Sequence, residues 1–204
     1  MFSKIIVQPL FTPSFIVFKE LTLNNEQILN ELKKLRYEKI TDSPSEKSFS
    51  IKILNEIKSG EKIQEEITLC LNTALKDIWK YDIGHTIVNS WATKTDSNCD
   101  SKIHSHKNFW LSAVYYPYSK NKFKICFESD RLDLPSFDVN PLEYNCYNAH
   151  TWEYPIDTGD LIVFPATLKH KIVMNNTQET RYSIAVNILP KGKLGHSDGT
   201  LVMK

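Results

Sequence analysis

The stretch 160–175, DLIVFPATLKHKIVMN, decides the fold, because it holds two short runs rich in β-branched and aromatic residues with no helix between them. Five further runs of this kind lie between about residues 85 and 189, separated by Asn, Asp, Gly and Pro clusters: HTIVNSWATK, FWLSAVYYPY, FKICFES, HTWEYPI and TRYSIAVNIL. Seven or eight strands of this length without intervening helices predict a sandwich, a jelly roll or a barrel.

Ahead of these runs the sequence predicts two helices. Within residues 25–40, Ile28, Leu32 and Leu35 recur at helical spacing. Within residues 61–81 a longer apolar stripe predicts a second helix, and its members are Ile63, Ile67, Cys70, Leu71, Leu75 and Ile78. Each helix has an apolar face to cover, so we expect both to pack on the outer face of the β region.

Four shorter segments complete the chain. Two β-like runs, 4–11 and 14–21, come first. Residues 41–50 are predicted to form a polar loop, and residues 191–200 a loose loop near the C-terminus.

Composition narrows the class of protein. The formal net charge of +1 provides no global attraction to nucleic acid or to an anionic membrane. No run of about 18 apolar residues is present, and the first residues lack the apolar stretch of a signal peptide. The four cysteines are widely spaced, which favours reduced thiols. We therefore expect a soluble cytoplasmic protein without a membrane partner.

Two of the six histidines lie two residues apart in KIHSHKN, residues 102–108. Residues i and i+2 of a strand point to one face, so His104 and His106 can both aim into a β-barrel interior. Imidazoles suit Fe, Zn, Cu or Ni, and His170 in the stretch quoted first is the natural third ligand. The alternative is a polar strand face with His170 on the surface.

An arginine follows His170 in TRYSIAVN, residues 180–187, where Arg181 and Ser183 share one strand face. Pointing inward among apolar residues, Arg181 would be a buried charge that needs a carboxylate, and its planar fork matches a carboxylate with two hydrogen bonds. The alternative is an exposed arginine on an edge strand, paired with Glu179 or another surface acid.

Together, an H-x-H pair, a distal histidine and an R-x-S segment about ten residues later resemble the Fe(II)/2-oxoglutarate-dependent oxygenases. More narrowly, NSWATKTDSNCDSKIHSHKNFWLSAVYYPY, FESDR, GDLIVFPATLKHKI and RYSIAVNI look like the 2OG-Fe(II) oxygenase family of bacteria and phages, over about residues 60–190. The resemblance implies a mainly β protein with a double-stranded β-helix (a jelly roll, cupin-like) and N-terminal helices on its outside. We expect a single domain, 1–204, with an N-terminal support region, 1–82, and a jelly-roll catalytic core, 83–190.

The resemblance also implies a ligand set. His104 and His170 would bind Fe(II), and Arg181 with Ser183 would hold the distal carboxylate of 2-oxoglutarate. A tyrosine hydroxyl would meet the same carboxylate, and strand alternation favours Tyr116 over its neighbour in SAVYYP. With O2 as the other cosubstrate, the implied reaction is hydroxylation of a substrate with release of succinate and CO2.

One position departs from the broader superfamily, which has a carboxylate where this chain has His106. Three outcomes are open: His106 is a ligand, a carboxylate such as Asp130 replaces it, or water or halide fills the position. We expect ligation by His106, because strand alternation aims it correctly.

Two other functions remain open from sequence. A three-histidine dioxygenase of the cupin type would not use 2-oxoglutarate, and a jelly-roll binding module would have no catalytic metal. The substrate can be a small molecule, a peptide or a nucleotide, and the sequence leaves the oligomeric state undetermined.

Overall fold

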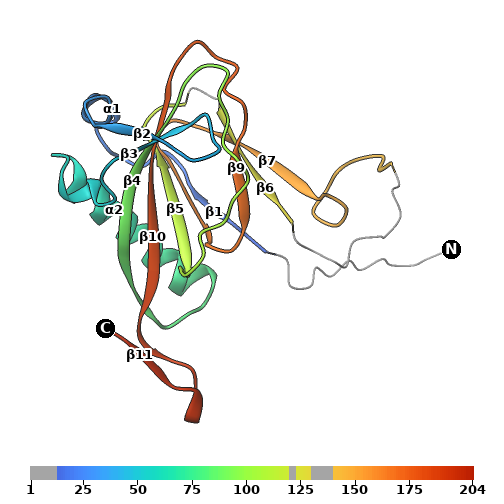
Figure 1. Ribbon diagram of the computed structural model, residues 1–204. Coiled ribbons are helices and arrows are strands. Elements are labelled where there is room, and N and C mark those ends of the chain that lie inside the picture. The colour runs from blue at the N-terminus through green and yellow to red at the C-terminus, as the bar shows by residue number, and fades with distance from the viewer. Residues whose placement is uncertain (1–12, 120–122, 130–139) are drawn as a thin grey trace.

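Two antiparallel β-sheets face each other in the computed structural model, which describes residues 13–119, 123–129 and 140–204 (Figure 1). The larger sheet has the strand order β1-β8-β5-β10-β4-β3-β2, and the smaller sheet has the order β7-β6-β9. The strands are β1 Ile16–Phe18, β2 Tyr37–Lys39, β3 Glu46–Ser48, β4 Gly84–Thr95, β5 Leu111–Tyr116, β6 Phe123–Glu128, β7 Thr151–Ile156, β8 Asp160–Pro165, β9 Lys169–Ile172, β10 Arg181–Leu194 and β11 Leu201–Met203.

From β4 onward the chain passes repeatedly between the two sheets. Strands β4, β5, β8 and β10 belong to the larger sheet, whereas β6, β7 and β9 belong to the smaller one. An isolated antiparallel bridge between His104 and His170 adds one more position to the edge of the smaller sheet. This alternation is that of a double-stranded β-helix, so the jelly roll expected from the sequence is confirmed, and all seven predicted β runs contain a strand.

The larger sheet has two different faces, which strand β10 illustrates. Its residues Ile184, Val186 and Ile188 pack in the core beneath the helices. The alternate residue Ala185 packs with Val114 in a second core, between the two sheets. Side chains in register with Ala185 therefore point into the jelly-roll interior.

The helices cover the outer face of the larger sheet, as expected (Figure 1). Helix α1, Asn25–Leu32, begins with the Asn24 side chain accepting a hydrogen bond from the Gln27 N–H at 3.1 Å. Helix α2, Gly60–Thr73, continues into a π-helical turn, η2, Ala74–Ile78. A short 3-10 turn, η1, Ile53–Asn55, precedes α2.

Three expectations were wrong in detail. The first helix ends at Leu32 and not near residue 40, because Tyr37 turns into β2 and its hydroxyl donates to the Leu32 carbonyl at 3.0 Å. The predicted loop 41–50 contains β3, which pairs with β2 and β4. The predicted loop 191–200 contains the end of β10 and the 3-10 turn η3, Ser197–Gly199, and β11 folds back onto β10 after Gly195, whose φ is +73°.

The N-terminal β-like runs have different outcomes. The run 4–11 lies outside the described residues, whereas the run 14–21 contains β1.

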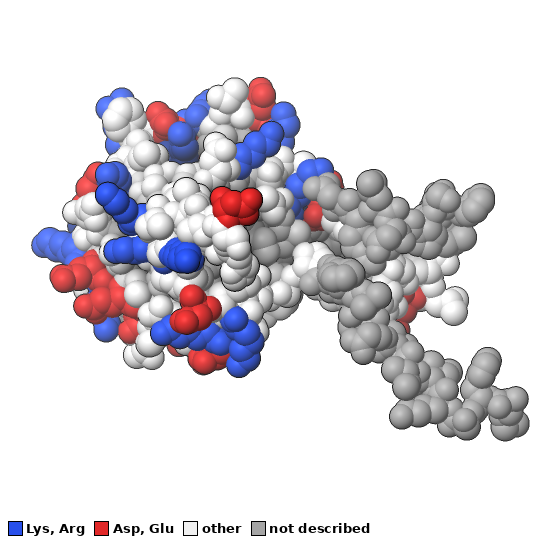
Figure 2. Space-filling view, turned by 90° about the horizontal axis from the view of Figure 1, so that it is seen from below, with Lys and Arg blue, Asp and Glu red and all other residues white. Residues whose placement is uncertain are grey.

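No helix among the described residues is long and apolar enough to cross a membrane. Figure 2 shows acidic and basic side chains interspersed over the face seen from below, in keeping with the small net charge.

Candidate metal centre

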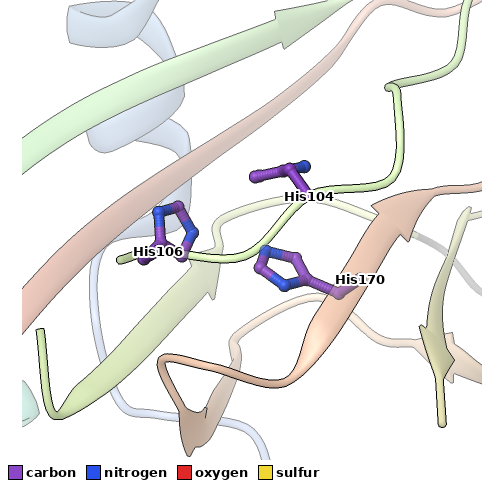
Figure 3. Close-up of side chains that lie close together, drawn as sticks. All are labelled: His104, His106 and His170. Atoms are coloured by element: carbon purple, nitrogen blue, oxygen red, sulfur yellow. The ribbon is translucent and has the colours of Figure 1, made fainter. Parts of the chain in front are cut away.

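Three histidine side chains converge at the edge of the smaller sheet (Figure 3). His104 and His106 come from the segment before β5, and His170 comes from β9. The ring centres lie 4.4 Å apart for His104 and His170, 5.1 Å for His106 and His170, and 5.2 Å for His104 and His106. One ligand nitrogen of each residue lies within 4.8 Å of the others, so the group can hold one metal ion.

Main-chain hydrogen bonds bring the three residues together. The His104 N–H donates to the His170 carbonyl at 3.0 Å, and the His170 N–H donates back at 2.9 Å. The His106 N–H donates to the Ala166 carbonyl at 2.8 Å, in the turn before β9. The expectation that His104 and His106 lie within a strand was therefore wrong, because only His104 pairs with β9, although both rings still reach one site.

Two of the imidazoles are oriented by backbone carbonyls. His104 Nδ1 lies 2.8 Å from the Lys102 carbonyl oxygen, and His170 Nδ1 lies 2.9 Å from the Leu168 carbonyl oxygen. A carbonyl oxygen only accepts, so each Nδ1 carries the proton. The Nε2 lone pairs of His104 and His170 are then available to a metal, and the ring orientation is fixed in advance.

Burial keeps two of these histidines neutral. His170 is 5% exposed, and desolvation, followed by the nearby charge of His104, lowers its pKa to about 3. The same two causes lower the pKa of His106 to about 4. A metal therefore need not displace protons from His106 and His170 at neutral pH.

Within the described part of the chain, these three histidines are the one group of three or more His, Cys, Asp or Glu side chains with converging ligand atoms. The group includes no carboxylate. Asp130, the alternative third ligand, lies outside the described residues. His85, His150 and His196 are not part of the group.

Arg181 lies in the interior between the two sheets. Its side chain is 1% exposed, so the alternative of a surface arginine on an edge strand is wrong. Its guanidinium carbon lies 5.5 Å from the ring centre of Tyr116 and 5.7 Å from that of Phe123. Burial lowers the pKa of Arg181 to about 10, with Tyr116 opposing, so Arg181 is still cationic at neutral pH.

The polar ends of Arg181 and Tyr116 have unused hydrogen-bonding capacity. Arg181 Nη1, Arg181 Nη2 and the Tyr116 hydroxyl are buried and have no hydrogen-bond partner among the described residues. A buried cation with free donors is costly unless an anion meets it. The distal carboxylate of 2-oxoglutarate is a planar anion, so it has the charge and the geometry to accept hydrogen bonds from these free donors.

Strand alternation distinguishes the two neighbouring tyrosines of β5. Tyr116 belongs to the interior core with Val114. Tyr115 points the other way, and its hydroxyl donates to the Asn25 side chain at the start of α1. Ser183 is 2% exposed and lies two residues after Arg181 on the same face. Arg181, Ser183 and Tyr116 therefore all lie on the interior side of the larger sheet.

An open pocket of about 620 Å³ adjoins the histidines. Its wall includes Trp91, whose ring centre lies 5.5 Å from that of His106. Local sequence gives no reason to place β2 and β3 at this pocket. These strands contribute Glu38, Lys39 and Lys47 to the pocket, and their contact depends on long-range pairing with β4 that no local pattern signals.

Comparison with known proteins gives a match to a family model and a fold. The family model described as "Putative 2OG-Fe(II) oxygenase" matches residues 89–187. No curated protein sequence matches the chain. Among solved structures, HygX from Streptomyces hygroscopicus with nickel, 2-oxoglutarate and hygromycin B bound is similar with a TM-score of 0.61 and 10% identity, over 88% of this chain and 84% of that one.

Two further structures have the same fold. The non-heme α-ketoglutarate-dependent epimerase SnoN from nogalamycin biosynthesis has a TM-score of 0.62 and 11% identity, over 87% of this chain and 77% of that one. A prolyl hydroxylase from Trichoplax adhaerens, in complex with a peptide fragment, has a TM-score of 0.59 and 8% identity, over 87% and 84%.

Proposed function

We propose, from the premise that residues 89–187 of this chain belong to the 2OG-Fe(II) oxygenase family, that His104, His106 and His170 hold the iron and that Arg181 holds the cosubstrate. The activity is that of an Fe(II)- and 2-oxoglutarate-dependent oxygenase. One observation carries the assignment of residues. The same jelly roll contains three converging imidazoles and a buried guanidinium whose two terminal nitrogens have no hydrogen-bond partner among the described residues.

Each group has a defined task in this proposal. The three histidines bind the metal through neutral nitrogens, and the two carbonyl contacts at Nδ1 fix the rings of His104 and His170. Arg181 and Tyr116 donate to the distal carboxylate, with Ser183 on the same face as a further donor. Bound together, Fe(II) and 2-oxoglutarate supply the oxidising chemistry, in which O2 is consumed and succinate and CO2 are released.

The default outcome of that chemistry is hydroxylation, and we place the substrate in the pocket beside His104 and His106. Trp91 and Ile51 give this pocket an apolar surface, while Lys39 and Lys47 supply positive charge at its wall. Lys47 is already paired with Glu38 at 3.2 Å. Similar structures have been solved with hygromycin B and with a peptide fragment, which supports a small molecule or a peptide as the substrate class.

The decisive test is an anaerobic titration of 2-oxoglutarate into the Fe(II)-loaded protein. Bidentate chelation of iron by the cosubstrate gives a weak visible charge-transfer band, which we expect for the wild type. We expect His106→Ala to lose both the band and the iron, whereas the matched variant His85→Ala should keep both, because His85 is outside the histidine group. Bound iron without any band would contradict the proposal and favour a three-histidine dioxygenase that does not use 2-oxoglutarate.

A further inference from the structure

A buried acid lies beside the proposed cosubstrate clamp. Asp160 is the first residue of β8, is 0% exposed and is the register partner of Tyr116 on β5. Its neighbours at two-residue spacing, Ile162 and Phe164, belong to the interior core, so its side chain is on the interior face of the strand. Neither the proposed metal site nor the proposed clamp uses this carboxylate.

The two oxygens of Asp160 have different surroundings. Oδ2 accepts hydrogen bonds from the Lys19 ammonium at 2.9 Å and from the Asp157 N–H at 2.9 Å. Oδ1 is buried and has no hydrogen-bond partner among the described residues. In that part of the chain, Oδ1 shares this condition only with the Tyr116 hydroxyl and the two terminal nitrogens of Arg181.

Asp160, Tyr116 and Arg181 lie close enough to influence one another. Burial raises the pKa of the Tyr116 hydroxyl, the charge of Arg181 lowers it, and the charge of Asp160 adds a smaller increase. The Tyr116 hydroxyl has one hydrogen to donate. A ligand carboxylate bound by Arg181 would therefore compete with Asp160 for that hydrogen, and the two anions would repel each other in a poorly solvated interior.

Lys19 is the charge that can remove this conflict. It follows directly after β1, its side chain is 43% exposed, and it contacts Asp160 and the half-exposed Asp157. The Lys19 contact compensates the negative charge of Asp160, which leaves Arg181 free to neutralise a ligand. Without Lys19, one uncompensated negative charge would remain next to the site of an anionic cosubstrate.

We propose that Lys19 is a positioning residue for 2-oxoglutarate, because it neutralises the buried Asp160 so that Tyr116 and Arg181 can both bind the distal carboxylate. This inference rests on the proposed function. It assigns a role to the N-terminal segment around β1, which lies outside the matched residues 89–187. The segment thereby contributes to cosubstrate affinity through charge, without contact with the ligand.

The test compares variants that remove or keep the charges of Lys19 and Asp160. The measured quantity is the dissociation constant of 2-oxoglutarate, obtained from the anaerobic visible titration of the Fe(II)-loaded protein. Lys19→Met should raise this constant about tenfold. Lys19→Arg should leave it within about twofold, because the charge is kept. The double variant K19M/D160N should restore it to within about twofold of the wild type, since the uncompensated acid is gone.

Lys124→Met is the matched control, because it removes another lysine ion pair, to Glu153 at 3.0 Å, from the outer face of β6. It should leave the constant unchanged. If Lys19→Met and K19M/D160N weakened 2-oxoglutarate binding equally, the inference would be overturned, because Lys19 would then only hold β1 in place. Wild-type affinity for 2-oxoglutarate in Lys19→Met would also overturn it.

Asp160→Asn provides a second route if Lys19→Met does not fold. With Lys19 still present, it should leave the constant unchanged or lower it, and an increase of about fivefold would overturn the inference. Failure of the proposed function is distinguishable from all of these results, because the wild type itself would then show no 2-oxoglutarate band.

Discussion

The guanidinium carbon of Arg181 lies 5.5 Å from the ring centre of Tyr116, and both side chains end in buried polar atoms that have no partner among the described residues. A buried charge without a counter-ion destabilises the fold that contains it. The relationship therefore fits a site built for an incoming anion and not for stability.

We predict that Arg181→Met raises the free energy of unfolding of the metal-free protein by roughly 1–4 kcal/mol, because it removes an uncompensated buried charge. The same variant should bind iron but lose the rise in melting temperature that 2-oxoglutarate gives the wild type. Urea unfolding and thermal melts measure both effects. Arg36→Met, at an arginine stacked on the exposed Phe49, is the control that should show neither.

Tyr116→Phe should weaken 2-oxoglutarate binding by about 10- to 150-fold, because a hydrogen bond to a charged carboxylate contributes about 1.5–3 kcal/mol. Tyr115→Phe is the matched control on the opposite face of β5. It removes the hydrogen bond to Asn25 and should cost about 1 kcal/mol of stability while cosubstrate affinity stays unchanged. The opposite pattern in the two variants would reassign the clamp tyrosine.

His106→Ala should reduce iron affinity far more than His85→Ala, since His106 contributes one of the three converging nitrogens. His106→Asp should retain iron, because a carboxylate oxygen is also a suitable ligand and lowers the charge of the site. Iron content after anaerobic loading and dialysis measures both results. If His106→Ala kept full iron content, a ligand outside the histidine group would have to complete the site.

The metal-free protein should become less stable as the pH falls from about 6.5 to about 4. Burial lowers the pKa of His106 to about 4 and that of His170 to about 3. Over this window the unfolded chain takes up protons that the folded chain does not, so stability is full above the unfolded pKa and falls below it.

His106 and His170 each change the free energy of unfolding by at most about 1.4 kcal/mol per pH unit. Burial also lowers the pKa of His85, so His85 acts in the same direction. Urea unfolding at pH 7, 6, 5 and 4.5 measures the slope. His170→Gln should have a shallower slope than the wild type. An identical slope would show that His170 is not protected from protons in the folded state.

The β half of the fold could be predicted from sequence because every strand there carries a local signal. In DLIVFPATLKHKIVMN, strand length and β-branched residues identify β8 and β9 without knowledge of their partners. The first helix was predicted too long because Leu35 continues the apolar spacing beyond Leu32. What ends the helix there is the pairing of β2 with β3 and the contact from Tyr37, which depend on residues distant in the chain.

The candidate site shows the same limit. His104 and His106 stand out as a closely spaced pair, and His170 and Arg181 stand out because each interrupts apolar β sequence. Asp160 left a similar signal, as an acid at an inward-facing position of an apolar run, but its significance depends on Lys19, which lies far away in sequence. Local patterns thus identify the residues that we propose contact ligands, and only the fold identifies the charges that we propose balance them.

The backbone pairing of His104 with His170 gives the metal a mechanical consequence. A single ion bound to both side chains would cross-link two chain positions that only one isolated bridge joins, and so close the long loop between them. Because the unfolded chain does not bring these histidines together, binding of the ion favours the folded state. Iron would then act as a reversible cross-link between the two chain positions. The iron-loaded protein should therefore resist cleavage by proteases between positions 104 and 170 better than the metal-free protein.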